Sequence, residues 1–505
     1  MAVLSSLRFS FAMKAAGALL LVIIAQWLFY GQEPGGTLGV FTLAWCAVLP
    51  VAAPALRRGA PAASLAVAAV LALLLVDDPS PLGWALSWTM IASAALLPRR
   101  RFDDAFTWLA RLATLALIGV VSPARDLAML SRRSGRVGAA PGALVRLMAL
   151  PLVGGAMFLA LFASANPVLG QALGGIAPPS LGDVILHLFF WAAVLVVVWP
   201  TFRPRALSLV GGVIPRGASL DLPVATLAAS LAAFNAVFAL QNALDLVFLW
   251  SAAPLPPGVT LAEYAHQGAY TLIATALIAG AFVLIALAPG SRAAHSRVVR
   301  RLLLLWIAQN VLLVASSALR LVDYIDAYSL TVLRIAALAW MALVAVGLIL
   351  VCWRLLAGRS AAWLVNANAL AAAATLVAAN AVDLGAIAAR WNVDRARRAE
   401  QLDLCYLGSL GSSALLPLID LERRAAGPVL RDRARYLRRD IQATLIDAQT
   451  DWHQWTWRGA RRLAAAQALI GRDVAPLRPA PDGRECNGAI IPPSPPARLT
   501  EGSVR

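Results

Sequence analysis

Apolar runs of about 20 residues recur along this chain, and they constrain its fold more than any other feature. A helix of that length crosses the hydrocarbon core of a bilayer, where only helices and closed barrels satisfy all backbone hydrogen bonds. The composition agrees, because 60% of the 505 residues are hydrophobic and only 14% are charged, which is not typical of soluble proteins. We therefore expect an all-α fold, a polytopic transmembrane helical bundle of about eleven spans, with ten to twelve compatible with the pattern.

The expected spans form an N-terminal group and a later group, separated by a basic stretch. The N-terminal group comprises Ala15–Tyr30, Thr37–Leu56, Pro61–Val76 and Leu82–Pro98. The later group comprises Leu147–Ala165, Val184–Pro200, Leu222–Trp250, Ala269–Pro289, Leu302–Leu319, Leu330–Trp353 and Ala361–Ala381.

The charges in the connections predict an orientation. Basic connections such as Arg57–Arg58 and Arg99–Arg101 alternate with acidic ones such as Asp77–Asp78. Because cytoplasmic loops carry an excess of Lys and Arg, the N-terminus is expected in the cytoplasm and the C-terminal region on the outer, periplasmic side. The same rule explains the net charge of +17 without nucleic acid as a partner. The predicted location is a bacterial cytoplasmic (inner) membrane, with the lipid bilayer as the first partner.

One apolar segment, Ala105–Val121, does not fit this alternation. It contains Arg111, and a strongly basic stretch from Arg125 to Arg146 follows it. If it spanned the membrane, these arginines would lie outside, so we expect an interfacial or re-entrant helix on the cytoplasmic side. A true span followed by an atypical loop remains the alternative.

The composition changes at Asp383, after which the chain is amphipathic, charged and too polar to span. Gly408, Gly411 and Gly427 divide this region into short helices. The expected organisation is four N-terminal transmembrane helices (1–98), a basic segment with the interfacial or re-entrant helix (99–146), a seven-helix transmembrane core (147–382), an extramembrane helical domain (383–470) and a disordered Pro-rich tail (471–505).

Two features of the C-terminal region each allow two interpretations. Trp452, Trp455 and Trp457 either pack in a core or contact the membrane surface, where Trp is favoured. Cys405 and Cys486 could form a disulfide if the region is periplasmic, although Cys486 belongs to the Pro-rich end. The four cysteines fit neither a zinc spacing nor a disulfide framework.

Polar side chains within the apolar helices are the candidate functional residues, because such groups need internal partners in a membrane. Asn235, Asn242 and Asp245 are spaced by seven and three, so they share one helical face. Either Arg320 or Arg334 could pair with Asp245 at the outer ends of the helices. We favour interhelical hydrogen bonding, with a ligand or ion site as the alternative. The full candidate polar cluster is Asn235, Asn242, Asp245, Glu263, Tyr264, His266, Asn310, Arg320, Tyr324 and Arg334.

Motifs for common enzyme chemistry are absent from the sequence. It has no phosphate-binding G-x-x-x-x-G-K-[ST] loop, no H-E-x-x-H zinc motif and no G-x-S-x-G nucleophile elbow. Glu263 and His266 have the spacing of half a di-iron carboxylate site, but no matching second half follows. No catalytic residue, metal ligand or cofactor is therefore predicted.

Several stretches resemble a known family in their amino-acid sequence and not only in their hydropathy. They are Leu161–Val168, Asn235–Trp250, Leu255–Leu284, Leu319–Met341 and Trp391–Gly411. Together they are similar to a family of uncharacterised bacterial integral membrane proteins that is described only as a domain of unknown function. The likeness covers roughly residues 100–460 and implies a multi-spanning helical fold with a helical C-terminal piece outside the membrane. It implies no activity.

The leading functional hypothesis is a non-enzymatic sensing, scaffold or regulatory membrane protein, which binds a periplasmic or membrane protein partner through residues 383–470. Two alternatives remain open. A secondary transporter of a small solute should line a path between the two membrane faces with polar residues. An envelope-lipid-modifying enzyme should gather an acid, a base and an arginine in one closed pocket.

Overall fold

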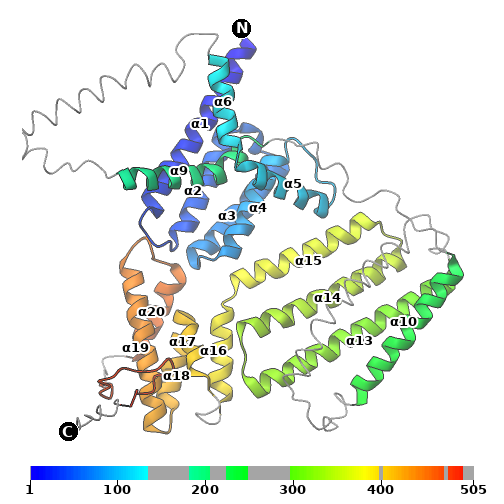
Figure 1. The fold of residues 1–505 in the computed structure, drawn as a ribbon, viewed down its shortest axis with the longest axis vertical. Coiled ribbons are helices and arrows are strands. Elements are labelled where there is room, and N and C mark those ends of the chain that lie inside the picture. The colour runs from blue at the N-terminus through cyan, green and yellow to red at the C-terminus, as the bar shows by residue number, and fades with distance from the viewer. Residues whose placement is uncertain are drawn as a thin grey trace, which may run out of the picture. The chain divides into compact units, whose positions relative to one another are not determined.

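The computed structural model describes residues 2–134, 181–204, 223–247, 296–396, 402–470 and 476–492. The described residues form helices joined by short connections, and one isolated antiparallel bridge joins Arg484 to Ile490. The chain divides into two compact units, the first comprising Met1–Phe102 and Trp108–Gly211, the second Asp103–Thr107 and Gly212–Arg505 (Figure 1). The prediction of an all-α fold is confirmed.

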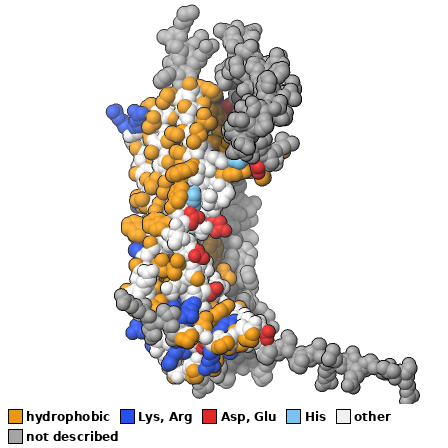
Figure 2. Space-filling model, turned by 90° about the vertical axis from the view of Figure 1, so that its left-hand side faces the viewer, with side chains coloured by type: hydrophobic (Ala, Val, Ile, Leu, Met, Phe, Trp, Pro, Cys, Tyr) orange, Lys and Arg blue, Asp and Glu red, His pale blue; other side chains and the backbone are white. Residues whose placement is uncertain are grey.

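The first unit is a bundle of apolar helices whose buried side chains meet around Trp45. The indole Nε1 of Trp45 donates to Thr201 Oγ1 over 3.1 Å, so even its polar atom is satisfied in the core. Other large apolar side chains, such as Ile23 and Trp27, are exposed, as expected for a surface in contact with lipid. Hydrophobic side chains cover much of the face drawn in Figure 2. The helices are α1 (Ala2–Phe29), α2 (Thr37–Ala52), α3 (Gly59–Asp77), α4 (Pro81–Leu96), α5 (Ala105–Gly119), α6 (Ser122–Ser134) and α9 (Leu181–Phe202).

Four long helices of the second unit lie side by side in the order α10, α13, α14 and α15 (Figure 1). Their starts follow the rules for helix capping: the hydroxyls of Ser296, Thr331 and Ser360 accept hydrogen bonds from the third residue of α13, α14 and α15. The left-handed Gly358 ends α14, where a residue with a side chain would be strained. The helices are α10 (Val224–Asp245), α13 (Arg297–Tyr328), α14 (Val332–Ala357) and α15 (Ala361–Ala381).

Among the described residues, seven helices are long and apolar enough to cross a membrane, so the chain is a multi-pass membrane protein. These candidates lie in α1, α3, α9, α10, α13, α14 and α15. The expected spans 147–165 and 269–289 lie outside the described residues. Helix α5 has 15 residues and rises about 22 Å, less than the roughly 30 Å of a hydrocarbon core. Its interfacial or re-entrant placement stays a prediction.

The C-terminal helices form a small apolar core of their own. Its fully buried members include Leu407, Leu415 and Leu418. The outer faces of the same helices carry charged side chains, which are visible at the bottom of Figure 2. Helical periodicity after Asp383 therefore yields packed amphipathic helices. They are α16 (Leu384–Arg395), α17 (Leu404–Ser409), α18 (Leu415–Arg424), α19 (Pro428–Thr450) and α20 (Trp457–Ile470), with a short 3₁₀ turn at Gly411–Ala414.

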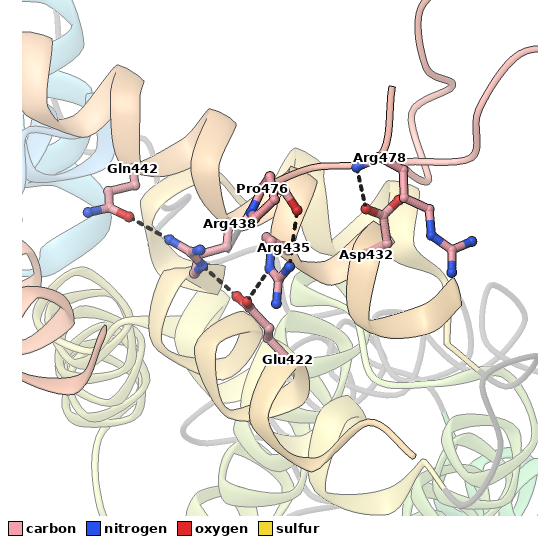
Figure 3. A network of polar contacts seen from close by, with 7 residues as sticks. All are labelled: Glu422, Asp432, Arg435, Arg438, Gln442, Pro476 and Arg478. Carbon is pink, nitrogen blue, oxygen red and sulfur yellow. Dashed lines mark hydrogen bonds and ion pairs between the residues drawn. The ribbon is translucent and has the colours of Figure 1, made fainter. Parts of the chain in front are cut away.

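Part of the Pro-rich end belongs to this helical core, which corrects the expectation of disorder for residues 476–492. Cys486 forms a disulfide with Cys405 of α17. Arg484 donates to Asp432 of α19 over 2.7 Å. The backbone N–H of Arg478 donates to the same carboxylate over 3.1 Å, as Figure 3 shows. Apolar content alone did not predict this order, because the segment is held by a covalent bond and a buried ion pair.

Candidate functional site

Helices α10 and α13 meet through amides buried in an otherwise apolar interface. The side-chain Nδ2 of Asn235 donates to the carbonyl of Leu302 over 3.0 Å, and Gln309 Nε2 donates to Asn235 Oδ1 over 2.9 Å. Amide pairs of this kind hold membrane helices together, because no water competes for their hydrogen bonds in the hydrocarbon core. Their interhelical geometry agrees with the structural interpretation of the sequence pattern.

About two and three turns beyond Asn235 on α10, the polar contacts continue toward its C-terminal end. Asn242 Nδ2 donates to the backbone carbonyl of Gln309 over 3.2 Å. Asp245, which is only 1% exposed, forms an ion pair with Arg320 and accepts from Gln241 Nε2 over 3.0 Å. The buried pairing of two charges avoids the cost of leaving either one alone in the membrane. Of the two arginines that the sequence offered to Asp245, the structure uses Arg320.

Three buried oxygens of this interface accept no hydrogen bond from the part of the chain that the structure describes. They are Oδ1 of Asn242, Oδ2 of Asp245 and Oε1 of Gln309, which lie on side chains that are otherwise hydrogen-bonded. A buried acceptor without a donor costs about 1–3 kcal/mol. The α10–α13 interface therefore combines structural hydrogen bonds with three acceptors that a small hydrogen-bond donor or cation would satisfy.

Arg334 has a different place, at the turn between α13 and α14. Its guanidinium lies over the ring of Tyr324, 4.3 Å from the ring centroid, and donates to the carbonyls of Tyr328, over 2.6 Å, and Ser329. These carbonyls end α13, so Arg334 supplies donors that the helix itself lacks at its last turn. The turn also contains Ser329 with φ of 72°, a left-handed conformation that the arginine contacts help to hold.

The same turn is joined to the C-terminal helices by Asn392 of α16. The backbone N–H of Leu330 donates to Asn392 Oδ1 over 2.7 Å, and Asn392 Nδ2 donates to the carbonyl of Leu330 over 2.9 Å. Two residues later, the backbone N–H of Val332 donates to the hydroxyl of Tyr406 over 2.8 Å. Asn392 and Tyr406 were not among the site residues predicted from the sequence, although both belong to the stretch Trp391–Gly411 that carries the family resemblance.

A second junction lies where α15 ends and α16 begins. Asp383 caps α16 by accepting from the backbone N–H of Ala386 over 2.9 Å, and it also forms an ion pair with Arg462 of α20. Arg458, one turn earlier on α20, donates to the carbonyl of Ala381, the last residue of α15, over 3.2 Å. Helix α20 is thus attached to the end of α15 and to the start of α16, while Asn392 attaches α16 to the turn before α14.

A cavity of about 840 Å³ opens beside the first junction. Its lining is strongly polar: Asp326, Asp394 and Asp403 contribute carboxylates, and the guanidinium of Arg395 lies 3.5 Å from the ring centroid of Trp391. Asp394 is not a free carboxylate, because Arg390 and Arg424 each donate to it over 2.8 Å. The hydrogen bond from Arg390 is the main cause that holds the pKa of Asp394 below its ordinary value.

The structure therefore divides the predicted polar cluster into three parts. Asn235, Asn242, Asp245 and Arg320 meet between α10 and α13, whereas Tyr324 and Arg334 meet at the turn. Asn310 donates to the carbonyl of Trp306 in its own helix over 2.8 Å. The remaining three members, Glu263, Tyr264 and His266, lie outside the described residues.

Comparisons with known proteins place the chain in a family. No curated protein and no solved structure matches it. A family model described as "Domain of unknown function (DUF4153)" matches residues 16–421, a range that includes the second half of α1 and all of α2 to α4 as well as the candidate site. The match agrees with the expected family and extends the likeness toward the N-terminus, but it ends at residue 421, before α19 and short of the expected end near residue 460. Because the model covers most of the chain, the protein belongs to the family of the domain of unknown function DUF4153.

Proposed function

We propose that this chain is a sensing or scaffold protein of a bacterial cytoplasmic membrane, and that its C-terminal helices receive a partner on the outer side and relay that contact to the α10–α13 interface. The single observation that carries the proposal is the double hydrogen bond between Asn392 and Leu330, which fixes α16 to the turn between two membrane helices. A domain that only rested on the membrane surface would not need a hydrogen-bonded attachment to the turn between two membrane helices.

The contacts on either side of this bond form a continuous route. Arg334 holds the carbonyls that end α13 and stacks on Tyr324, and Arg320 lies one helical turn before Tyr324 on α13. Arg320 pairs with Asp245 of α10. A contiguous network of hydrogen bonds and ion pairs can transmit a change at one site to another. A contact made at α16 could thus change the contacts at the α10–α13 interface.

The cavity beside Asn392 supports a sensing role, because a partner placed there would touch α16 and the turn at once. Its aspartates and Arg395 favour a polar or charged group of the partner over an apolar one. The Cys405–Cys486 disulfide supports the outer side, since disulfides persist in oxidising compartments such as the bacterial periplasm. Helices α13, α14 and α15 cross in alternating directions, so the turn at Ser329 and the end of α15 lie on the same side as this domain.

Hydrogen exchange of the reconstituted full chain tests the relay. In Asn392→Ala, we expect faster amide exchange in α16, at the turn and also along the α10–α13 interface around Asp245. The matched control is Arg484→Ala, which breaks a buried ion pair of the same C-terminal helices on the side of α19. The control should change exchange in α19 and residues 476–492 only. Faster exchange in Asn392→Ala that stops at α16 would overturn the proposed relay.

Orientation has its own test. Reporter fusions after Ala381 and near Arg136 should give a periplasmic and a cytoplasmic signal, respectively. The second position lies outside the described residues, but the assay needs only the sequence. A cytoplasmic signal after Ala381 would contradict both the eleven-span topology and the outer placement of the C-terminal helices.

A secondary transporter of a small solute is the second candidate, and one observation favours it. Asn242 Oδ1 and Asp245 Oδ2 are buried acceptors without a donor among the described residues, as expected where a cationic or hydrogen-bond-donating solute binds. Proteoliposome uptake of small cations and amines would decide between the two. Uptake by the wild type that is lost in Asn242→Leu, with a normally folded variant, would replace sensing with transport as the leading function.

A further inference from the structure

Three tryptophans lie exposed in and beside the short connection between α19 and α20. Trp452, Trp455 and Trp457 are 48%, 38% and 54% exposed. Core packing, one of the two interpretations that the sequence allowed, is therefore wrong for all three. Six residues thus place three large indole rings on the surface of the C-terminal helices. Removing these rings from water would be strongly favourable in free energy.

The position of this connection points to what covers the indoles. Arg458, next to Trp457, donates to the carbonyl of Ala381 at the last residue of α15. Arg462, one turn further, is paired with Asp383, two residues after that helix end. Since α15 is a membrane-spanning candidate that ends at Ala381, the start of α20 lies at the level where the span leaves the bilayer. That level is the region of the lipid headgroups.

The chemistry of the cluster fits the headgroup region. Tryptophan is enriched there because its ring is apolar while its N–H can still find a hydrogen-bond partner. Arg461 is exposed and lies over Trp457, 5.6 Å from the ring centroid, so a positive charge accompanies the indole. Exposed arginines near a membrane surface are attracted to anionic lipid.

We propose that Trp452, Trp455 and Trp457 insert into the interface of the bilayer that α15 crosses, with Arg461 beside anionic phosphates, and so hold the C-terminal helices against the lipid surface. The proposal does not depend on the sensing function or on which side of the membrane the domain occupies. It assigns the connection between α19 and α20 as a lipid-binding surface.

Spin-label accessibility in the full chain tests the insertion. The background variant carries Cys46→Ala and Cys352→Ala, so that no free thiol remains and the Cys405–Cys486 disulfide stays intact. A label is attached at Trp457→Cys or Trp455→Cys, and the protein is reconstituted into vesicles of phosphatidylethanolamine and phosphatidylglycerol. The matched control is Asp482→Cys, an exposed carboxylate position in the turn near Cys486.

We compare the ratio of the label's accessibility to oxygen, which dissolves in lipid, with its accessibility to an aqueous nickel complex. This ratio should be severalfold higher at positions 455 and 457 than at position 482. Nickel accessibility equal to that at position 482 would overturn the proposal.

A second measurement avoids the label. In vesicles whose lipid chains are brominated near the headgroup, bromine quenches the fluorescence of indoles that reach the lipid. The quenched fraction of the tryptophan fluorescence should therefore be smaller in Trp457→Phe than in the wild type. An unchanged quenched fraction would likewise show that this indole does not reach the lipid. An intact disulfide in both variants confirms that the C-terminal helices are folded.

Discussion

Asn392 pairs with Leu330 as a neighbouring strand would, accepting from the backbone N–H and donating to the backbone carbonyl of the same residue. Both partners are buried, and Leu330 lies in the turn that joins two membrane helices, where no helical hydrogen bond is available to it. One amide side chain therefore satisfies two backbone groups that would otherwise lack partners.

Replacing this amide should destabilise the junction. Asn392→Ala leaves the N–H and carbonyl of Leu330 without their partner, and we expect a loss of about 1–3 kcal/mol, because a buried group without a hydrogen bond bears its full desolvation cost. Thermal unfolding of the purified protein in detergent, followed by pulse proteolysis, measures the effect. The control is Gln32→Ala, an exposed amide in the connection between α1 and α2, which should leave stability unchanged. Equal stability in both variants would contradict the role given to Asn392.

Removing the carboxylate of Asp245 should lower both protein level and detergent stability. Asp245→Ala leaves the buried guanidinium of Arg320 without its carboxylate, a change that costs about 3–5 kcal/mol in buried pairs. Asp323→Ala, which removes an exposed carboxylate from α13, is the control and should behave as the wild type. The double variant Asp245→Ala/Arg320→Leu should recover part of the loss, since no charge is then left buried. Wild-type stability of Asp245→Ala alone would exclude a structural role for the pair.

The disulfide should contribute a further measurable part of the stability. It joins cysteines separated by 81 positions. The chain-entropy account gives about 4.5 kcal/mol for a closed loop of that size, and the typical contribution of a disulfide is about 2–4 kcal/mol. Cys486→Ser should therefore release residues 476–492 from α17 and raise their hydrogen exchange. Cys352→Ser changes a cysteine that forms no disulfide and serves as the control. Mass spectrometry without reductant should find the bond in the wild type, and two free thiols at these positions would contradict the structure.

Acid should loosen the attachment of the same segment. Burial by itself raises the pKa of Asp432, but the hydrogen bonds from Arg484 and from the backbone N–H of Arg478 outweigh it, so the net pKa lies below the ordinary value. A depressed folded pKa gives stability that is fully present above the unfolded pKa of about 3.9 and is lost as the pH falls through the folded value. We expect residues 476–492 to become susceptible to protease as the pH is lowered below about 4. In Arg484→Leu this transition should move to higher pH, and an unchanged midpoint would exclude Asp432 as the group responsible.

Some of this structure follows from sequence because the membrane leaves few alternatives. The apolar runs predict the spanning helices, and the cost of a charge in hydrocarbon predicts that Asp245 has an arginine partner. The choice of Arg320 over Arg334 depends on which helix faces pack together, and spacing along the chain cannot supply it.

The contacts outside the apolar runs were harder to foresee. Asn392 lies in a charged amphipathic helix, where an asparagine is ordinarily a solvated residue, and only the turn before α14 gives it a partner. Cys486 lies in a segment whose Pro-rich composition is typical of disorder, so its bond to Cys405 was only one of two open interpretations. Tertiary contacts of single residues decide both cases, and hydropathy is insensitive to them.

If the C-terminal helices lie on the outer side, as proposed, the bond between Cys405 and Cys486 also links the insertion of the chain to its maturation. A copy whose C-terminal helices remained on a reducing side could not oxidise these thiols, and its last residues would lack their covalent tie to α17. Correctly and wrongly inserted copies of one sequence would then differ in their resistance to proteases. The envelope could remove the wrong ones without recognising any feature of the membrane helices themselves.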